Sequence, residues 1–216
     1  MKPRVVLIGS SWHARVIIEI LEERNELELV GCTSIDSTQS EVLGYPILGN
    51  DAVLPQLLAS GVHLAFVAIG HNETREAVAR RIEELGLELI NAISGRAILS
   101  PRAVVGRGVA IMPGAVVNTG VIIGDGVVVN TGATIDHDCS IGRYAHIGPG
   151  ANLAGSVRIG DGALLGVGSS VVPGIRIGLW VTVGAGAAVI RDLPDYVTAA
   201  GVPAIPVSSR TGHRRY

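Results

Sequence analysis

An aliphatic residue recurs at every sixth position from Ile93 to Val189, and no step of this repeat is missed. In most units a small or β-branched residue follows four positions after the aliphatic one, for example Ala133 and Cys139. Neither an α-helix nor a meander of hairpins keeps a period of six over this length. The repeat therefore predicts a parallel β-prism, each coil having three six-residue sides and inward-pointing aliphatic side chains.

The composition fits such a prism. Of the 216 residues, 48% are hydrophobic but only 3% are aromatic, and 29 are glycine. Small and β-branched side chains suit tightly wound sheets, and the coils would stack at the ~4.8 Å spacing of paired strands. The repeat leaves the hand of the winding open, although crossover connections are usually right-handed.

Residues 4–90 have a different pattern, in which strand and helix alternate. We expect strands at 4–9, 27–33 and 64–70, and amphipathic helices at 13–25 and 73–86. This order predicts a small parallel α/β sheet. Ligands of such sheets bind at the carboxyl ends of the strands, where Gly9 and Gly70 lie.

Charge and cysteine content exclude several classes of protein. A net charge of -2 gives no reason to expect nucleic acid or an anionic membrane as partner. Cys32 and Cys139 are the two cysteines, so there is no disulfide framework, and each is expected to be a small buried residue. No segment reaches the ~20 apolar residues of a membrane span, and the first apolar run is too short for a signal peptide. We therefore expect a cytoplasmic protein.

The sequence TIDHDCSIG at positions 134–142 places two carboxylates and an imidazole inside the apolar repeat. Since Ile135 is an inward position, Asp136 should face outward and His137 should lie at a corner of the prism. One interpretation is a solvated turn, the usual place of polar residues on a β-prism. The other is a catalytic base, because histidine accepts a proton near neutral pH and a neighbouring carboxylate, Asp138, stabilises the imidazolium.

Several motifs together resemble a known family. The stretch GATIDHDCSIGRYAHIGPGANLAGSVRIG and the later AGVPAIPV resemble left-handed β-helix acyltransferases. With LIGSSWHARVIIEIL and VAIGHNETR, the chain is similar to the sialic-acid O-acetyltransferase and nucleotide-linked 4-amino-sugar N-acetyltransferase family (NeuD/PglD-like). The resemblance covers nearly the whole chain except residues 34–60 and the end after Val207.

The resemblance implies an N-terminal Rossmann-like α/β domain at 1–90, which binds the nucleotide-sugar, and a left-handed parallel β-helix at 91–207, which binds acetyl-CoA. Residues 208–216 form a C-terminal tail. The implied activity is an acetyl-CoA-dependent N-acetyltransferase that acts on the amino group of a nucleotide-linked amino-sugar for polysaccharide synthesis. The implied assembly is a homotrimer with active sites between subunits, and the reaction needs no metal.

The resemblance also implies roles for individual residues. His137 would be the base that deprotonates the attacking amine, and Asp138 the carboxylate that supports it. The acetyl-CoA contacts would be His146, Asn130, Gly155, Val167 and Ala185, and the nucleotide-sugar contacts would be Gly9, Ser11, Trp12, His13 and Gly70. The step from His137 to His146 is half of a complete coil, so the two histidines would share a site only across a subunit boundary.

Two departures from the family affect acceptor recognition. The first loop reads GSSWH, with Trp12 in place of a glycine that relatives carry. The second strand ends in GCTSID, where relatives often have an acidic pair. The choice between an amino and a hydroxyl acceptor therefore stays open, and so does the identity of the nucleotide.

The sequence is also compatible with other functions. O-acetylation of a sugar hydroxyl or another small acceptor is the nearest alternative, and a non-catalytic trimeric scaffold with a ligand-sensing domain is another. A zinc site is disfavoured, because His137 and His146 are the two histidines of the repeat and His213 lies in the tail. A dinucleotide site at Gly9 is disfavoured because the second and third glycines of that fingerprint are missing.

Overall fold

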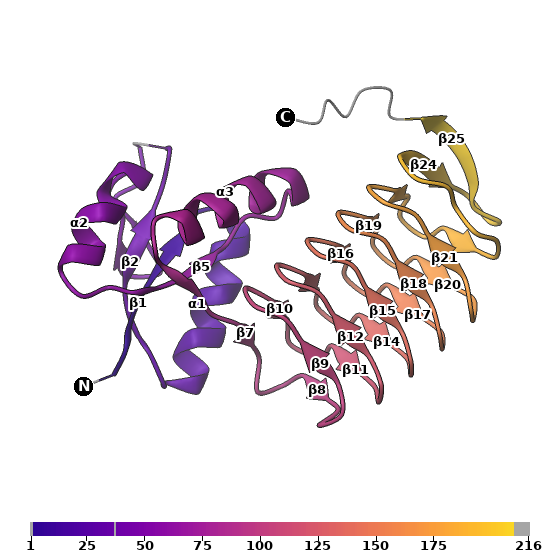
Figure 1. The fold of residues 1–216 in the computed structure, drawn as a ribbon, viewed down its shortest axis with the longest axis horizontal. Helices are drawn as coiled ribbons and strands as arrows, with labels where there is room; N and C mark the ends of the chain where they lie inside the picture. Colours follow the sequence, from indigo (N-terminus) through magenta and orange to yellow (C-terminus); the bar gives the residue numbers. More distant parts are fainter. Residues whose placement is uncertain (1, 37, 210–216) are drawn as a thin grey trace. The chain divides into compact units, whose positions relative to one another are not determined.

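The computed structural model describes residues 2–36 and 38–209, so residues 210–216 of the predicted tail lie outside the described part. The chain divides into two compact units, Met1–Gly95 and Arg96–Tyr216. Figure 1 shows helices around a small sheet in the first unit and a stack of β-coils in the second.

A four-stranded parallel sheet forms the centre of the first unit. Its order is β2 (Glu28–Thr33), β1 (Arg4–Ile8), β5 (Leu64–Val67) and β6 (Glu88–Leu89). The central strand β1 is almost continuously apolar, and its residues Val5 to Ile8 are all buried. A strand covered on both faces has this pattern, so the predicted parallel α/β sheet is confirmed.

Among the described residues, three α-helices accompany the sheet: α1 (Trp12–Arg24), α2 (Leu54–Ala59) and α3 (Asn72–Glu84). Helix α1 buries an apolar stripe, and its C-cap residue is Asn25, which has φ 52° and donates its N–H to Leu21 O. The segment 34–60, for which the sequence made no prediction, forms the hairpin β3 (Glu41–Val42) and β4 (Tyr45–Pro46), the 3-10 turn η1 (Asp51–Val53) and α2. The short strand β7 (Ala92–Ile93) precedes the end of this unit.

The second unit is a parallel β-helix built from two-residue strands that begin at every sixth position. One sheet contains β8 (Ile98–Leu99), β11 (Val116–Val117), β14 (Thr134–Ile135), β17 (Asn152–Leu153), β20 (Ser170–Val171) and β23 (Ala188–Val189). The next contains β9 (Val104–Val105), β12 (Ile122–Ile123), β15 (Ser140–Ile141), β18 (Arg158–Ile159) and β21 (Arg176–Ile177). The third side contains β10 (Ala110–Ile111), β13 (Val128–Val129), β16 (His146–Ile147), β19 (Leu164–Leu165) and β22 (Thr182–Val183).

Each strand pairs in parallel with the strand one coil later, so that residues at the same place in successive coils are neighbours; Ile135 pairs with Leu153, for example. The second residue of each two-residue strand is an aliphatic residue of the sixfold repeat, and these residues are buried from Ile111 onward. In the first coil Leu99 and Val105 are only half-buried. The predicted prism and its inward positions are therefore confirmed.

The β-helix ends in an antiparallel hairpin. Strand β24 (Val197–Ala200) continues the third sheet by pairing in parallel with β22, and β25 (Ile205–Ser209) then runs back along β24. The sixfold repeat does not predict this reversal. Among the described residues, no helix combines the length and the apolar character that a bilayer span requires.

Candidate active site

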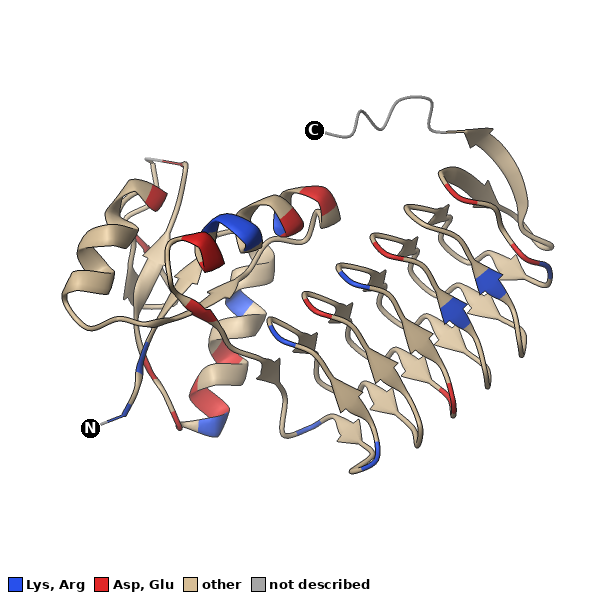
Figure 2. Ribbon diagram, viewed as in Figure 1, with Lys and Arg blue, Asp and Glu red and all other residues tan. Residues whose placement is uncertain are grey.

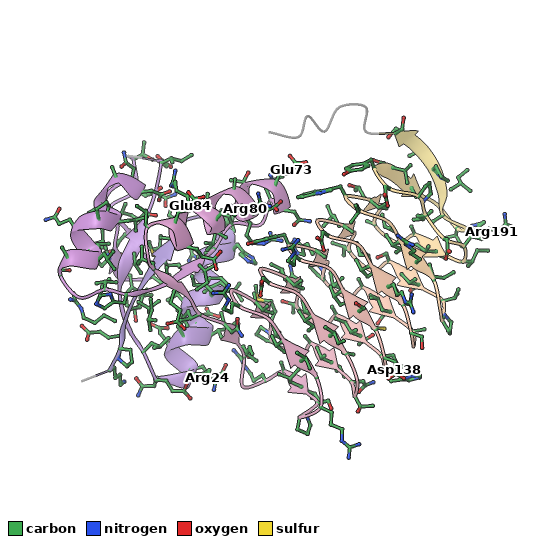
Figure 3. All side chains as sticks on the ribbon, in the orientation of Figure 1. Arg24, Glu73, Arg80, Glu84, Asp138 and Arg191 are labelled. Carbon is green, nitrogen blue, oxygen red and sulfur yellow. The ribbon has the colours of Figure 1, made fainter. Side chains whose placement is uncertain are left out.

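The triplet Asp136, His137 and Asp138 forms a corner between β14 and β15. Ile135 before it and Cys139 after it are buried, so the chain is anchored inside on both sides of the polar corner. Asp138 has φ 59°, a left-handed conformation that turns the chain from one sheet to the next. Figure 3 labels Asp138, which projects outward from the edge of the coils.

His137 and Asp138 are paired through their side chains. Nδ1 of His137 lies 2.9 Å from Oδ2 of Asp138, and the imidazole is 54% exposed. The hydrogen bond to Asp138 raises the pKa of His137, and the charge of Asp136 raises it further. Because Asp138 holds the Nδ1 proton, the neutral ring keeps Nε2 as its free basic nitrogen.

Asp136 is held by the preceding coil. Its Oδ1 accepts hydrogen bonds from Nδ2 of Asn118 at 2.9 Å and from the backbone N–H of His137 at 2.8 Å. These hydrogen bonds lower the pKa of Asp136. Asn118 was not among the predicted site residues, although its place one coil before Asp136 is a signal in the sequence that would have found it.

Two glycines of neighbouring coils pack against the pair. A Cβ atom on Gly155, which occupies the place of His137 in the following coil, would lie 2.6 Å from both Cε1 and Nε2 of the imidazole. A Cβ atom on Gly120, which occupies the place of Asp138 in the preceding coil, would lie 2.5 Å from Oδ1. The N–H of Gly155 donates to no acceptor among the described residues.

His146 and Asn130 lie on another side of the prism. His146 begins β16, Asn130 follows β13, and the side-chain amide of Asn130 lies 3.0 Å from Nε2 of His146. Val167 and Ala185 are exposed on one corner in successive coils, where Gly186 N–H bonds to Val167 O at 2.8 Å. The sheet that contains β14, β17 and β20 separates this corner from the corner of His137.

In the first unit, the predicted acceptor residues lie at the carboxyl ends of β1 and β5. Gly9 has φ 110°, and a Cβ there would approach Ala68 O to 3.0 Å, so glycine allows the two strand ends to meet. Ser11 is the N-cap residue of α1 but makes no side-chain cap hydrogen bond. Trp12 is 83% exposed, with the Arg15 guanidinium 5.7 Å from its ring centroid.

His13 is largely buried beside this edge. Burial, and then the charge of Arg75, lower the pKa of His13 to about 4, so its imidazole is neutral at physiological pH. Its Nε2 atom is buried and has no hydrogen-bond partner among the described residues. A neutral ring with an unsatisfied nitrogen is suited to a hydrogen bond with a ligand or a water molecule.

Sequence reasoning missed Arg75 in α3. Its guanidinium is buried and donates to the carbonyls of Ile69 and Gly70, each at 3.0 Å, and to Oδ1 of Asn72 at 2.9 Å. These contacts fix the loop between β5 and α3, which contains Gly70. An arginine inside an amphipathic helix is read as a solvated residue, so only the fold reveals this role.

The second strand, β2, lacks the acidic pair that relatives often have, but a carboxylate from another segment lies at its end. Thr33 donates its hydroxyl to Oδ1 of Asp51 at 2.7 Å, and Asp51 also forms an ion pair with Arg81 of α3. The carboxylate comes from η1 rather than from β2. Ser34 beside it accepts a hydrogen bond from Ser10 at 2.7 Å, which ties the loops after β1 and β2 together.

Comparison with known proteins adds two family matches and close solved structures. The family described as "PglD N-terminal domain" matches residues 4–82, and "Bacterial transferase hexapeptide (six repeats)" matches residues 102–137. PerB from Caulobacter crescentus, solved with CoA and GDP-perosamine, is 45% identical, with a TM-score of 0.91 over 94% of this chain and 97% of that chain. The chain belongs to the PglD-like family of left-handed β-helix acetyltransferases.

A second PglD-like structure is similar over its full length. The acetyltransferase domain of PglB from Neisseria gonorrhoeae, solved with acetyl coenzyme A, is 35% identical, with a TM-score of 0.90 over 96% of this chain and 100% of that chain. The uncharacterized protein L142 of Acanthamoeba polyphaga mimivirus is 32% identical over 104 residues, 48% of this chain. This chain spans about a fifth of that relative, since the match covers 20% of it.

These comparisons confirm the predicted family, the left-handed β-helix after an α/β domain, and the acyltransferase class. Charges are sparse on the β-helix of this PglD-like protein (Figure 2). Within residues 2–36 and 38–209, no three His, Cys, Asp or Glu side chains are grouped as metal ligands.

Proposed function

We propose that this protein transfers the acetyl group of acetyl-CoA to the amino group of a nucleotide-linked amino-sugar, with His137 as the base. The observation that carries the proposal is the His137–Asp138 pair, at 2.9 Å, in a chain 45% identical to an enzyme solved with CoA and GDP-perosamine. A GDP-linked 4-amino-sugar is therefore the first acceptor to test.

The chemistry needs one proton transfer. The sugar amine attacks the thioester carbonyl carbon while Nε2 of His137 removes a proton from the nitrogen, and CoA then leaves as its thiolate. Asp138 stabilises the imidazolium that forms and keeps the ring oriented. The imidazolium then returns the proton to the departing thiolate, so that the products are the acetamido sugar and CoA. The thioester is already activated, so Cys139 has no nucleophilic role.

The acetyl donor would contact residues of the β-helix. The N–H of Gly155, beside the imidazole, is free to donate to the thioester oxygen as negative charge develops there. Val167 and Ala185 would line the pantetheine, since they are exposed on one corner in successive coils. His146 and Asn130 would contact the acetyl end of the donor.

The acceptor would bind at the carboxyl edge of the first unit. Trp12 offers an exposed ring for stacking on the base or the sugar. His13 offers the unsatisfied Nε2, and Gly9, Ser11 and Gly70 shape the loops around it. Because His13 is neutral, it would offer a hydrogen bond there without adding a positive charge.

The assembly we propose is a homotrimer with shared sites. The donor residues His146 and Val167 and the base His137 lie on separate parts of one prism, so the donor corner of one subunit would face the base of its neighbour. Exposed apolar residues of the first coils, Ile98, Val104 and Ile122, would be covered in such an assembly.

We place the enzyme in the cytoplasm, where acetyl-CoA is available, in the synthesis of polysaccharide precursors.

Thiol release from acetyl-CoA tests this function. The wild-type protein is incubated with a panel of GDP-linked and UDP-linked sugars, each as the amine and as the matching hydroxyl compound. We expect turnover with a nucleotide-linked amine and mass addition of one acetyl group. Turnover restricted to the hydroxyl compounds would point to O-acetylation, and neither turnover nor donor binding would favour a non-catalytic scaffold.

A further inference from the structure

Gly155 stands at a corner position that other coils fill with larger residues. The equivalent positions in successive coils are Pro101, Thr119, His137, Gly155, Pro173 and Arg191. The backbone of Gly155 is not in the left-handed region. Neither the corner nor its backbone conformation therefore requires a glycine.

The imidazole of His137 explains the glycine. The three atoms closest to a Cβ on Gly155 would all belong to this ring, with Cε1 and Nε2 at 2.6 Å and Nδ1 at 3.2 Å. Real Cβ atoms do not approach other heavy atoms this closely. The ring thus occupies the volume that a side chain at position 155 would take.

A backbone ladder prevents the two coils from separating to relieve such a clash. The N–H of Asp136 bonds to Leu153 O at 3.0 Å, and the N–H of Ser156 bonds to His137 O at 2.9 Å. The ring itself would have to move instead. Nδ1 belongs to the ring and moves with it. A ring displaced from Gly155 would therefore lose the 2.9 Å contact between Nδ1 and Oδ2 of Asp138.

We propose that Gly155 is a positioning residue, whose missing side chain gives the His137 imidazole the space in which Nδ1 pairs with Asp138 and Nε2 stays open to the substrate. This inference rests on the proposed function, in which His137 is the base. It concerns the side chain that Gly155 lacks. The proposed hydrogen bond from the Gly155 N–H to the thioester oxygen is a separate role, because an alanine at this position would keep that N–H.

The test is Gly155→Ala, with Gly124→Ala as the matched control. Gly124 also stands at a corner outside the left-handed region, and a Cβ there would meet Arg143 N at 2.9 Å and Arg143 Cγ at 3.0 Å. In Gly155→Ala we expect kcat to fall by about 100-fold, the scale expected for a misplacement of about 1 Å. We expect KM for acetyl-CoA to change less than threefold. Gly124→Ala should keep its kcat.

NMR titration of His137 gives a readout that does not depend on turnover. We expect the pKa of His137 to fall in Gly155→Ala, because the ring loses its hydrogen bond to Asp138. The same pKa should be unchanged in Gly124→Ala. An unchanged pKa and kcat in a folded Gly155→Ala protein would overturn the inference.

A double-mutant cycle measures the clash directly. Gly155→Ala should lower the Tm in the wild-type background but have little effect in a His137→Ala background, where the ring is gone. An equal loss of Tm in both backgrounds would overturn the inference. If the wild-type protein turned over no substrate, the proposed function would be wrong. The histidine titration and the double-mutant cycle would still show whether the His137 ring packs against Gly155.

Discussion

The side-chain amide of Asn118 reaches across one full coil to Oδ1 of Asp136, at 2.9 Å, and the same oxygen accepts the N–H of His137. Asp136 therefore links the preceding coil to the backbone of the proposed base. Its negative charge also raises the pKa of His137, after the larger effect of Asp138.

Replacing Asp136 with asparagine should have a mild effect. We expect the pKa of His137 to fall slightly and kcat to fall less than about 10-fold, since the Asp138 contact remains and a general base contributes at least 10²-fold in all. Steady-state kinetics and histidine titration measure both. A loss as large as that of His137→Ala would mean that Asp136 takes part in the chemistry.

Replacing His137 with alanine should abolish general-base catalysis while the protein stays folded. We expect kcat to fall by about 10²–10⁴-fold, with the same CoA affinity and sedimentation behaviour, because the side chain is 54% exposed and contributes little packing. His137→Asn should behave alike. Near-normal turnover in a folded variant would leave the triplet as a solvated turn.

Replacing Asp138 with asparagine should change the pH dependence of the rate. The hydrogen bond to Asp138 raises the pKa of His137, so its loss lowers that pKa. His137 acts as a base only when neutral, and the acidic limb of the kcat profile should therefore move to lower pH. The maximal rate should fall, but less than in His137→Ala. A limb that moves to higher pH would contradict this account of the pair.

Replacing Trp12 with glycine should affect the acceptor more than the donor. The indole is 83% exposed and lies beside the proposed nucleotide-sugar loops, so its loss removes a stacking surface. We expect KM for the nucleotide-sugar, or the preference among acceptors, to change more than KM for acetyl-CoA. Equal changes in both KM values would assign Trp12 a structural role.

Replacing Arg75 with leucine should destabilise the first unit. The carbonyls of Ile69 and Gly70 would lose a buried donor, at a cost of about 1–3 kcal/mol. Arg80→Leu is the control, because exposed Arg80 pairs with Glu76 on the surface of α3, where such pairs contribute about 0–1 kcal/mol. Urea unfolding of both variants measures the difference, and similar losses would contradict a structural role for the buried guanidinium.

The fold of the second unit was predictable because its periodic residues are also its core. Every sixth residue from Ile93 to Val189 fills the second place of a strand, so the pattern gave both the strands and their inward faces. The hairpin of β24 and β25 was not predictable from that pattern, because the period stops at Val189.

The candidate site was only partly predictable. The Asp136–His137–Asp138 triplet is polar against an apolar repeat and is visible in the sequence, whereas Asn118 is a neighbour only through the winding of the coil. Arg75 and Asp51 were missed for another reason. Their partners, the carbonyl of Gly70 and the hydroxyl of Thr33, are brought to them by the packing of the α/β sheet.

The reversed strand at the end of the β-helix changes the kind of edge that one sheet presents. A parallel coil left open at its end is a template for another coil, and such ends can join into filaments. Here β25 runs antiparallel along β24 and covers that edge of one sheet. The third side of the prism thus ends in a strand of reversed direction, on which the parallel winding of another coil cannot simply continue.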